Sequence, residues 1–176
     1  NTEDGHILVF GLHEYRFGMH RSHELADFVA EVDGVMLAAH PYRRQMPWKP
    51  EDAEEYEDAL SRAERNPAYR FVIGIEILNG RGKLAENDFS TRLQRRMYLP
   101  ATAASDTHQF DEKEQHMGRA ATYFEQDFSD EAGLIKALRS GRFWPLDLTR
   151  GELSADPIYH DVPDDVTARW DEMAEA

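Results

Sequence analysis

The stretch PATAASDTHQF, residues 100–110, ends a run of small apolar residues with Asp106, Thr107 and His108. In a β-strand, side chains alternate between the two faces, so Asp106 and His108 would point the same way while Thr107 points away. A carboxylate and an imidazole on one face are ligands that Zn²⁺, Mn²⁺ or Fe²⁺ can accept. The Asp-x-His sequence is short and occurs often by chance. The alternative is therefore an exposed turn with an ordinary surface Asp and His.

Two other apolar runs also carry polar residues near their ends. His40 follows GVMLAA within residues 34–41, and Glu76 and Asn79 lie within FVIGIEILNG, residues 71–80. In parallel α/β folds, functional groups gather at the carboxyl ends of the strands. We therefore expect these side chains to share one face of the molecule with the Asp-x-His pair. For His40 alone, a hydrogen bond to the backbone with no further role is the alternative.

His6 occupies a different position, because it stands at the start of the apolar run HILVFGL, residues 6–12. A purely structural role is again the alternative for this residue alone. Taken together with His40 and His108, however, it makes three histidines that adjoin strand-like segments. This arrangement could bring three imidazoles and at least one carboxylate to one face.

The apolar segments have the length of buried strands, and the segments that separate them have helical character. For example, residues 22–33 place Leu25, Val29 and Val32 on one side of a helix. Strands that alternate with helices indicate an α/β fold with buried parallel strands, either a barrel or an open sheet. The predicted strands are 6–12, 34–41, 71–80 and 99–108, and the predicted helices are 22–33, 49–66, 87–99 and 129–141.

The length and composition of the chain set limits on its class. It has 176 residues, of which 41% are hydrophobic, enough for one compact domain or for a large piece of a bigger one. It has no apolar run of 18 residues and no export signal, so we expect a cytoplasmic protein without a membrane span. It contains no cysteine, so any metal must be held by His, Asp and Glu.

The charge balance is strongly acidic, with 34 Asp and Glu against 20 Lys and Arg and a formal net charge of −14. A polyanion would be repelled over most of such a surface, which disfavours general nucleic-acid binding and binding to anionic membranes. A small anionic ligand in a local basic pocket remains compatible with this balance.

Several fragments, in their order along the chain, resemble the PHP domain family, named for polymerase and histidinol phosphatase. They are TEDGHILVFGL (2–12), GVMLAAHPYR (34–43), GIEILNGRG (74–82) and ASDTHQFDEKEQHMGRAAT (104–122), and the resemblance continues through residue 145. It implies a distorted, TIM-like β/α barrel with up to three divalent metal ions, Mn, Zn or Fe, at its carboxyl-end face. It also implies an enzyme that hydrolyses phosphate esters of a small phosphorylated substrate.

The resemblance also implies roles for individual residues. The metal ligands by position are His6, His40, Asp106 and His108, with Glu76 as a ligand that only some family members use. Asp106 and His108 would also serve in catalysis. Tyr42 and Arg43, which follow His40-Pro41, resemble residues beside the substrate phosphate, and Asn79 and Arg81 could line the same mouth.

The chain departs from the family pattern at its start, because the family's opening H-x-H segment has no counterpart here. We therefore expect residues 1–147 to be the carboxyl-terminal portion of a PHP-like barrel that lacks its first strands, followed by an acidic peripheral tail at 148–176. Two alternatives to a phosphoesterase remain open. One is a metal-dependent hydrolase of the amidohydrolase type, and the other is a non-catalytic PHP-like binding or regulatory module.

Overall fold

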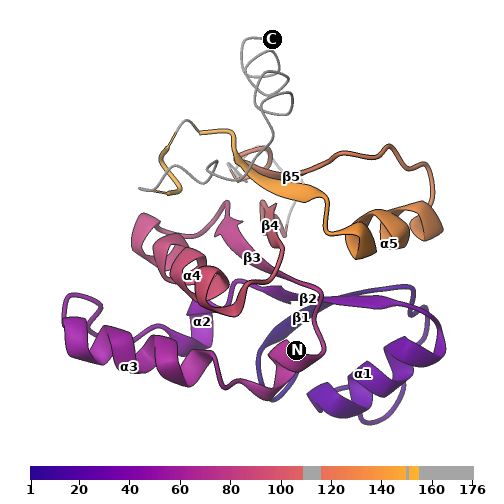
Figure 1. Ribbon diagram of the computed structural model, residues 1–176, viewed down its shortest axis with the longest axis horizontal. Coiled ribbons are helices and arrows are strands. Elements are labelled where there is room, and N and C mark those ends of the chain that lie inside the picture. Colours follow the sequence, from indigo (N-terminus) through magenta and orange to yellow (C-terminus); the bar gives the residue numbers. More distant parts are fainter. Residues whose placement is uncertain (109–115, 150, 155–176) are drawn as a thin grey trace.

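A computed structural model describes residues 1–108, 116–149 and 151–154 of the chain. Four strands form the main sheet in the order β1-β2-β3-β4, and two more strands form a small second sheet beside β4 (Figure 1). The strands are β1 His6–Phe10, β2 Val35–Ala39, β3 Gly74–Asn79, β4 Ala101–Ala104, β5 Ala120–Phe124 and β6 Phe143–Asp147.

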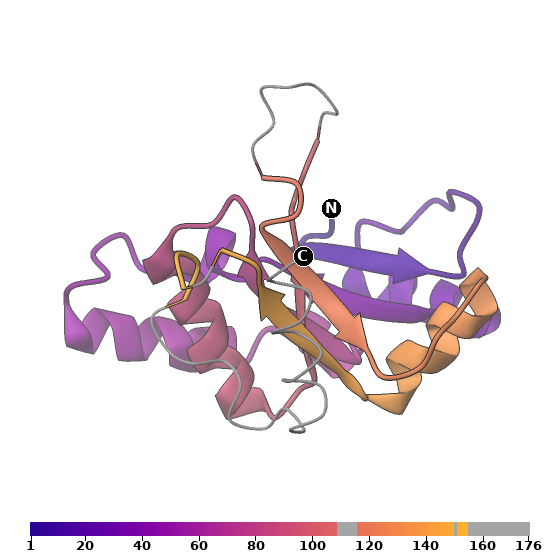
Figure 2. The same cartoon turned by 90° about the horizontal axis from the view of Figure 1, so that it is seen from above.

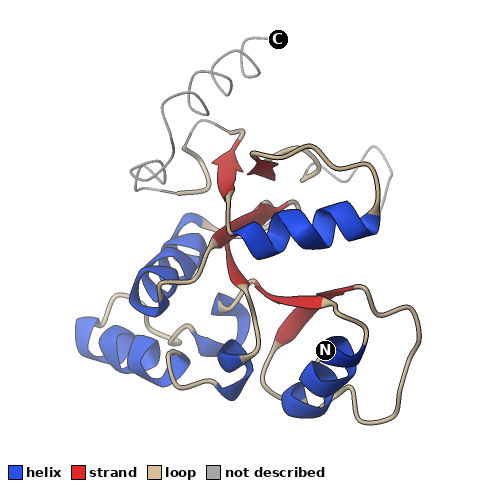
Figure 3. Cartoon of the chain, turned by 45° about the vertical axis from the view of Figure 1, so that its right-hand side comes forward, coloured by secondary structure: helices blue, strands red, loops and turns tan. Residues whose placement is uncertain are grey.

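Helices surround these strands, as Figure 3 shows in blue against the red strands. They are α1 Ser22–Glu31, α2 Tyr42–Gln45, α3 Ala53–Ala63, α4 Leu84–Met97 and α5 Glu131–Ser140, with a 3₁₀ turn at Pro67–Arg70. None of the described helices is long and apolar enough to cross a membrane. The four predicted helices are all present, with ends that differ by several residues, whereas the short helix α2 and the strands β5 and β6 were not predicted.

The main sheet is only partly parallel. β3 runs parallel to both β2 and β4, as expected, but β1 runs antiparallel to β2. The prediction that residues 6–12 form a parallel strand is therefore wrong.

The connection after β1 explains this direction. The loop after β1 returns to the level where the strand begins, because the backbone N–H of Glu3 donates to the carbonyl of His20 at 2.7 Å. Helix α1 therefore starts beside the beginning of β1 and runs the same way as β1. A tight turn at Asp33 and Gly34 then reverses the chain into β2.

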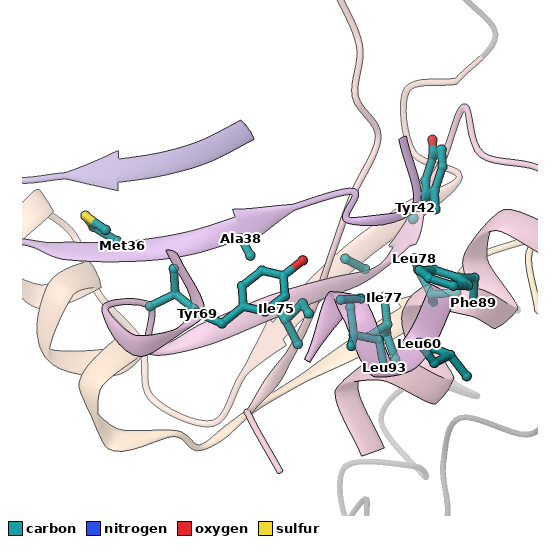
Figure 4. Close-up of a cluster of buried hydrophobic side chains, with 14 of the residues drawn as sticks. Met36, Ala38, Tyr42, Leu60, Tyr69, Ile75, Ile77, Leu78, Phe89 and Leu93 are labelled. Carbon is teal, nitrogen blue, oxygen red and sulfur yellow. The ribbon is translucent and has the colours of Figure 1, made fainter. Parts of the chain in front are cut away.

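The hydrophobic core lies where α3 and α4 pack against β3 (Figure 4). Leu60 of α3 and Phe89 and Leu93 of α4 are fully buried, as are Ile75 and Leu78 of β3. The apolar residues of β3 are buried on both faces, which is typical of a central strand in an α/β sheet. This packing gives β3 a rigid frame that fixes the position of any polar side chain on it.

The sheet is open in the part of the chain that the structure describes, and no closed barrel forms there. Beyond β4 lies the small antiparallel sheet of β5 and β6. The hydroxyl of Thr122 on β5 joins this sheet to β4, because it donates to the carbonyl of Ala103 and accepts from its N–H, at 2.8 and 2.9 Å. The coarser prediction of an α/β fold with mostly parallel main-sheet pairings is thus confirmed, while the barrel is not seen.

The chain after β6 still contributes to the folded body. Leu153 is 1% exposed and packs into the core, and Ser154 is also buried. The carboxylate of Asp147 holds this segment, since it accepts hydrogen bonds from the backbone N–H groups of Thr149, Gly151 and Leu153. Most of the predicted tail, 155–176, lies outside the described residues, and the division at residue 147 stays a prediction.

Candidate metal centre at the strand ends

The antiparallel pairing of β1 with β2 brings two histidines together. In the register of these strands, His6 lies opposite Ala39, so the start of β1 is next to the end of β2. His40 follows directly after Ala39. As a result, Nδ1 of His6 lies 3.2 Å from Nε2 of His40, and the two rings meet edge to face. Figure 2 shows β1 with its beginning beside the marked amino terminus.

The spacing of these two nitrogens fits a shared metal ion. Two nitrogen ligands at about 2.1 Å from one ion, meeting it at roughly 90–110°, lie about 3.0–3.4 Å apart. The separation of 3.2 Å between His6 and His40 falls within this range. Burial and the nearby guanidinium of Arg43 lower the pKa of both imidazoles, which favours the neutral form that a metal requires. The pair is therefore suited to bind a divalent cation.

Glu76 lies directly behind His40. Its Oε2 accepts a hydrogen bond of 2.5 Å from the backbone N–H of His40, and its side chain is almost completely buried. Burial, reinforced by the negative charge of Asp106, raises the pKa of Glu76 to about 8. The carboxyl group is therefore largely protonated at neutral pH and fixes the backbone at His40. A cation nearby would favour its ionised form.

Asp106 and Arg43 form an ion pair in front of the histidines. Nη2 of Arg43 lies 2.6 Å from Oδ2 of Asp106, whose side chain is 13% exposed. The negative charge of Asp106 also acts on His6, His40 and Glu76, where it favours protonation of each group. Its carboxylate thus lies near the same point as the other predicted ligands, although one oxygen is bonded to arginine.

His108 lies beside Asp106 but faces outward. Its Nδ1 is 2.7 Å from the carbonyl oxygen of Asp106 and 3.1 Å from Nη1 of Arg81, and 60% of its side chain is exposed. Arginine can only donate, so Nδ1 either accepts from Arg81 or, when protonated, donates to the carbonyl. In the second tautomer Nε2 keeps its lone pair, and a histidine held this way by a carbonyl is typical of metal ligands.

Two of these residues have an uncommon backbone conformation. His40 and Asp106 have φ angles of 26° and 55°, in the left-handed region that residues other than glycine and asparagine seldom adopt. Each such residue costs on the order of 1–3 kcal/mol, and such residues cluster at functional sites. The hydrogen bond from His40 to Glu76 offsets part of that cost at one of them.

The predicted substrate residues lie around this centre. Asn79 is buried at the end of β3, and its Nδ2 lies 3.4 Å from Oε1 of Glu76. Tyr42 belongs to the core, with its ring 6.0 Å from that of His40 (Figure 4). Only Arg43, whose side chain is 40% exposed, is open to a ligand. These three substrate assignments stay predictions.

The site is a partial metal centre. Within 1–108, 116–149 and 151–154, no three His, Asp or Glu residues gather closely enough to form a complete ligand set. A small cavity of about 20 Å³ adjoins the histidine pair, and Arg43 and Arg44 both line it. This local positive charge contrasts with the net charge of −14 for the whole chain and suits a small anion beside the histidines.

Comparison with known protein families places part of this arrangement. The family model described as PHP-associated matches residues 85–143, one third of the chain. Residues 85–143 are a PHP-associated region. This region contains Asp106 and His108 but begins after the other predicted ligands. The resemblance inferred from the sequence is confirmed for this segment.

Other comparisons are more distant. A crystal structure from Bifidobacterium adolescentis, described as a candidate metal-dependent phosphoesterase, is 17% identical with a TM-score of 0.34. The similarity covers 74% of this chain and 39% of that one, so the chain spans well under half of its length. No curated protein matches the sequence.

The structure adds residues that sequence reasoning did not single out. Arg119, inside the PHP-associated region, donates to the carbonyl of Gly80 at 3.0 Å and so joins the loop after β3 to the second sheet. Asn87 on α4 is fully buried and bonds to the backbone of Asn79. The one signal for Asn87 is a polar residue three positions after Leu84 and four before Thr91, on the helix face that meets the sheet.

Proposed function

We propose that this chain carries part of the site of a metal-dependent phosphoesterase, which hydrolyses phosphate esters of a small substrate. The observation that carries the proposal is the 3.2 Å approach of His6 to His40, produced by the register of β1 on β2. The PHP-associated match at 85–143 supports it independently. In the same proposal, the whole protein has a PHP-type barrel, whose further strands supply further ligands.

In this proposal His6, His40, Asp106 and His108 hold divalent ions, Mn, Zn or Fe, with Glu76 able to join them when ionised. Such ions lower the pKa of a bound water from near 16 toward about 7 and so make a hydroxide nucleophile accessible at neutral pH. The proposal thus gives the strand-end histidines and carboxylates one shared purpose.

Arg43 binds and orients the substrate. One of its five N–H donors is engaged with Asp106, which leaves others free for the oxygens of a phosphate group. Fixed positive charge beside the reacting phosphate stabilises the charge that develops on its oxygens. Arg43 is therefore the residue through which the chain recognises the anionic part of the substrate.

A second candidate function is a non-catalytic module that binds a small anion. The observation that favours it is the 2.6 Å ion pair of Arg43 with Asp106, because it commits a predicted metal ligand to a protein partner. In such a module, Arg43 and Arg44 would bind the anion without a metal ion.

The two functions are separated by metal binding and by phosphate release. The chain is freed of metal with a chelator, titrated with Mn²⁺ and Zn²⁺ by calorimetry, and assayed for inorganic phosphate release from phosphate monoesters. A phosphoesterase requires saturable binding that is lost in His40→Ala and kept in His13→Ala, an exposed histidine beside Glu131. Anion binding with no metal binding at His40 would support the module instead.

A further inference from the structure

A buried network of hydrogen bonds connects helix α4 to the histidine pair. Asn87 of α4 is 0% exposed, and its carboxamide binds both backbone groups of Asn79 at the end of β3. Its Oδ1 accepts from the N–H of Asn79 at 3.0 Å, and its Nδ2 donates to the carbonyl of Asn79 at 3.3 Å. The same Nδ2 donates to the carbonyl of Leu153 at 2.9 Å.

These partners fix the orientation of the Asn87 side chain. Two carbonyl oxygens face one end of the carboxamide and one N–H faces the other, so a flipped amide would meet three unfavourable contacts. The backbone N–H of Asn87 donates to Lys83 and its carbonyl accepts from Thr91, so both backbone groups are also satisfied. A fully satisfied buried network of this kind rigidifies the elements that it joins.

The network continues from Asn79 to the candidate metal ligands. Nδ2 of Asn79 lies 3.4 Å from Oε1 of Glu76, which is the longest of these contacts. Oε2 of Glu76 accepts the N–H of His40 at 2.5 Å, and His40 contacts His6. The main chain of β3 provides a second connection, because Asn79 and Glu76 lie three residues apart on the same strand.

We infer that Asn87 is a positioning residue for the histidine pair. It holds the end of β3, and through Asn79 and Glu76 it holds His40 in its left-handed conformation. This inference rests on the proposed function only in its consequence for metal binding. It also gives a specific task to the PHP-associated region, which includes Asn87, and to Leu153, which supplies one carbonyl of the network.

Two variants perturb Asn87 in different ways. Asn87→Asp keeps the size of the side chain and the oxygen that faces Asn79 N–H, but it replaces the donor that faces two carbonyls. Gly82→Ala leaves Asn87 in place chemically, but the new Cβ would lie 2.7 Å from its Oδ1 and displace it. Ser90→Ala is the matched control, because Ser90 is equally buried on the same helix and its hydroxyl donates only to Glu86.

The experiment measures the amide proton shift of His40 by NMR and the Mn²⁺ affinity by calorimetry, on the 176-residue chain. In Asn87→Asp and Gly82→Ala, the His40 amide proton should move upfield as its hydrogen bond to Glu76 weakens. Mn²⁺ affinity should fall about tenfold, as it does when a partner of a metal ligand is removed. Ser90→Ala should change neither quantity.

The inference and the proposed function can fail separately. If the unaltered chain binds no Mn²⁺, the proposed function fails, while the His40 amide shift still decides the role of Asn87. If either folded variant keeps the His40 amide shift of the unaltered chain, Asn87 does not position His40. An equal upfield shift in Ser90→Ala would likewise overturn the inference, since it would mean that any change in α4 disturbs the site.

Discussion

Glu76 offers the sharpest test of the physical reasoning, because its environment should make stability depend on pH in an unusual direction. Burial raises the pKa of this carboxyl from 4.5 to about 8. Between those values, the folded chain keeps a proton on Glu76 that the unfolded chain has already lost. The free energy of unfolding therefore contains a contribution that falls as pH rises from about 4.5 to about 8.

The size of that contribution follows from the shift. One pKa unit corresponds to about 1.4 kcal/mol, so the full shift of Glu76 is a contribution of about 5 kcal/mol at most. Replacement by glutamine removes it, because Gln is a neutral isostere of the protonated carboxyl whose oxygen can still accept the N–H of His40. Glu76→Gln should thus be close to the unaltered chain in stability at pH 5 and several kcal/mol more stable at pH 8.5.

The assay is urea unfolding followed by circular dichroism at pH 5, 6, 7, 8 and 8.5, with a chelator present throughout because a divalent cation would favour the ionised carboxylate. Glu51→Gln is the control, since Glu51 is exposed on the loop before α3. Its difference from the unaltered chain should not change with pH. A stability difference for Glu76→Gln that is also flat across this range would refute the argument that burial keeps this carboxyl protonated.

Three further substitutions test other parts of the account. Arg43→Ala should weaken binding of inorganic phosphate about tenfold by calorimetry, since charge-assisted hydrogen bonds contribute about 1.5–3 kcal/mol; Arg139→Ala, an equally exposed arginine in a 2.6 Å ion pair, should not, and equal losses would remove Arg43 from anion binding. Phe89→Ala, at a fully buried position between α4 and the sheet, should lower the free energy of unfolding by about 3–5 kcal/mol in a urea titration, and a loss under 1 kcal/mol would contradict the packing described. Gly34→Ala should destabilise the β1–β2 pair by about 1–3 kcal/mol, because the new Cβ would lie 2.4 Å from the carbonyl oxygen of Phe10, and an unchanged midpoint would show that this turn can shift freely.

Much of the fold was readable from the sequence because its strands carry strong local signals. The runs that became β2 and β3 are short, almost wholly apolar and followed by polar residues, which is what buried parallel strands require. Helix α5 was also predictable, because Gly141 adopts the left-handed conformation at its end, with a φ of 68°.

The direction of β1 could not be read in the same way. It depends on where the loop after β1 meets the rest of the molecule, in particular on the contact between Glu3 and His20, and such contacts between distant residues leave no local pattern. The same direction explains the odd position of His6. A histidine at the start of an antiparallel strand lies at the same edge as one at the end of its neighbour.

The candidate site was predictable in its residue types but not in its hydrogen bonds. The sequence pointed to His40, Glu76 and Asp106, and the structure brings these three side chains into one electrostatic environment. It could not indicate that Glu76 would bond to the backbone of His40, or that Arg43 would pair with Asp106. Those contacts depend on angles between strands and loops that residue types do not determine.

The central claim is that divalent metal binds at the strand ends and not at the many acidic groups of the surface. The direct measurement is the selective broadening of backbone amide signals by substoichiometric Mn²⁺ in a ¹⁵N-labelled chain. The account predicts that the amides of His6, His40 and Asp106 broaden first, and that those of the acidic helix α3, Ala53–Ala63, stay sharp. Broadening that is strongest in α3, or uniform along the chain, would contradict it.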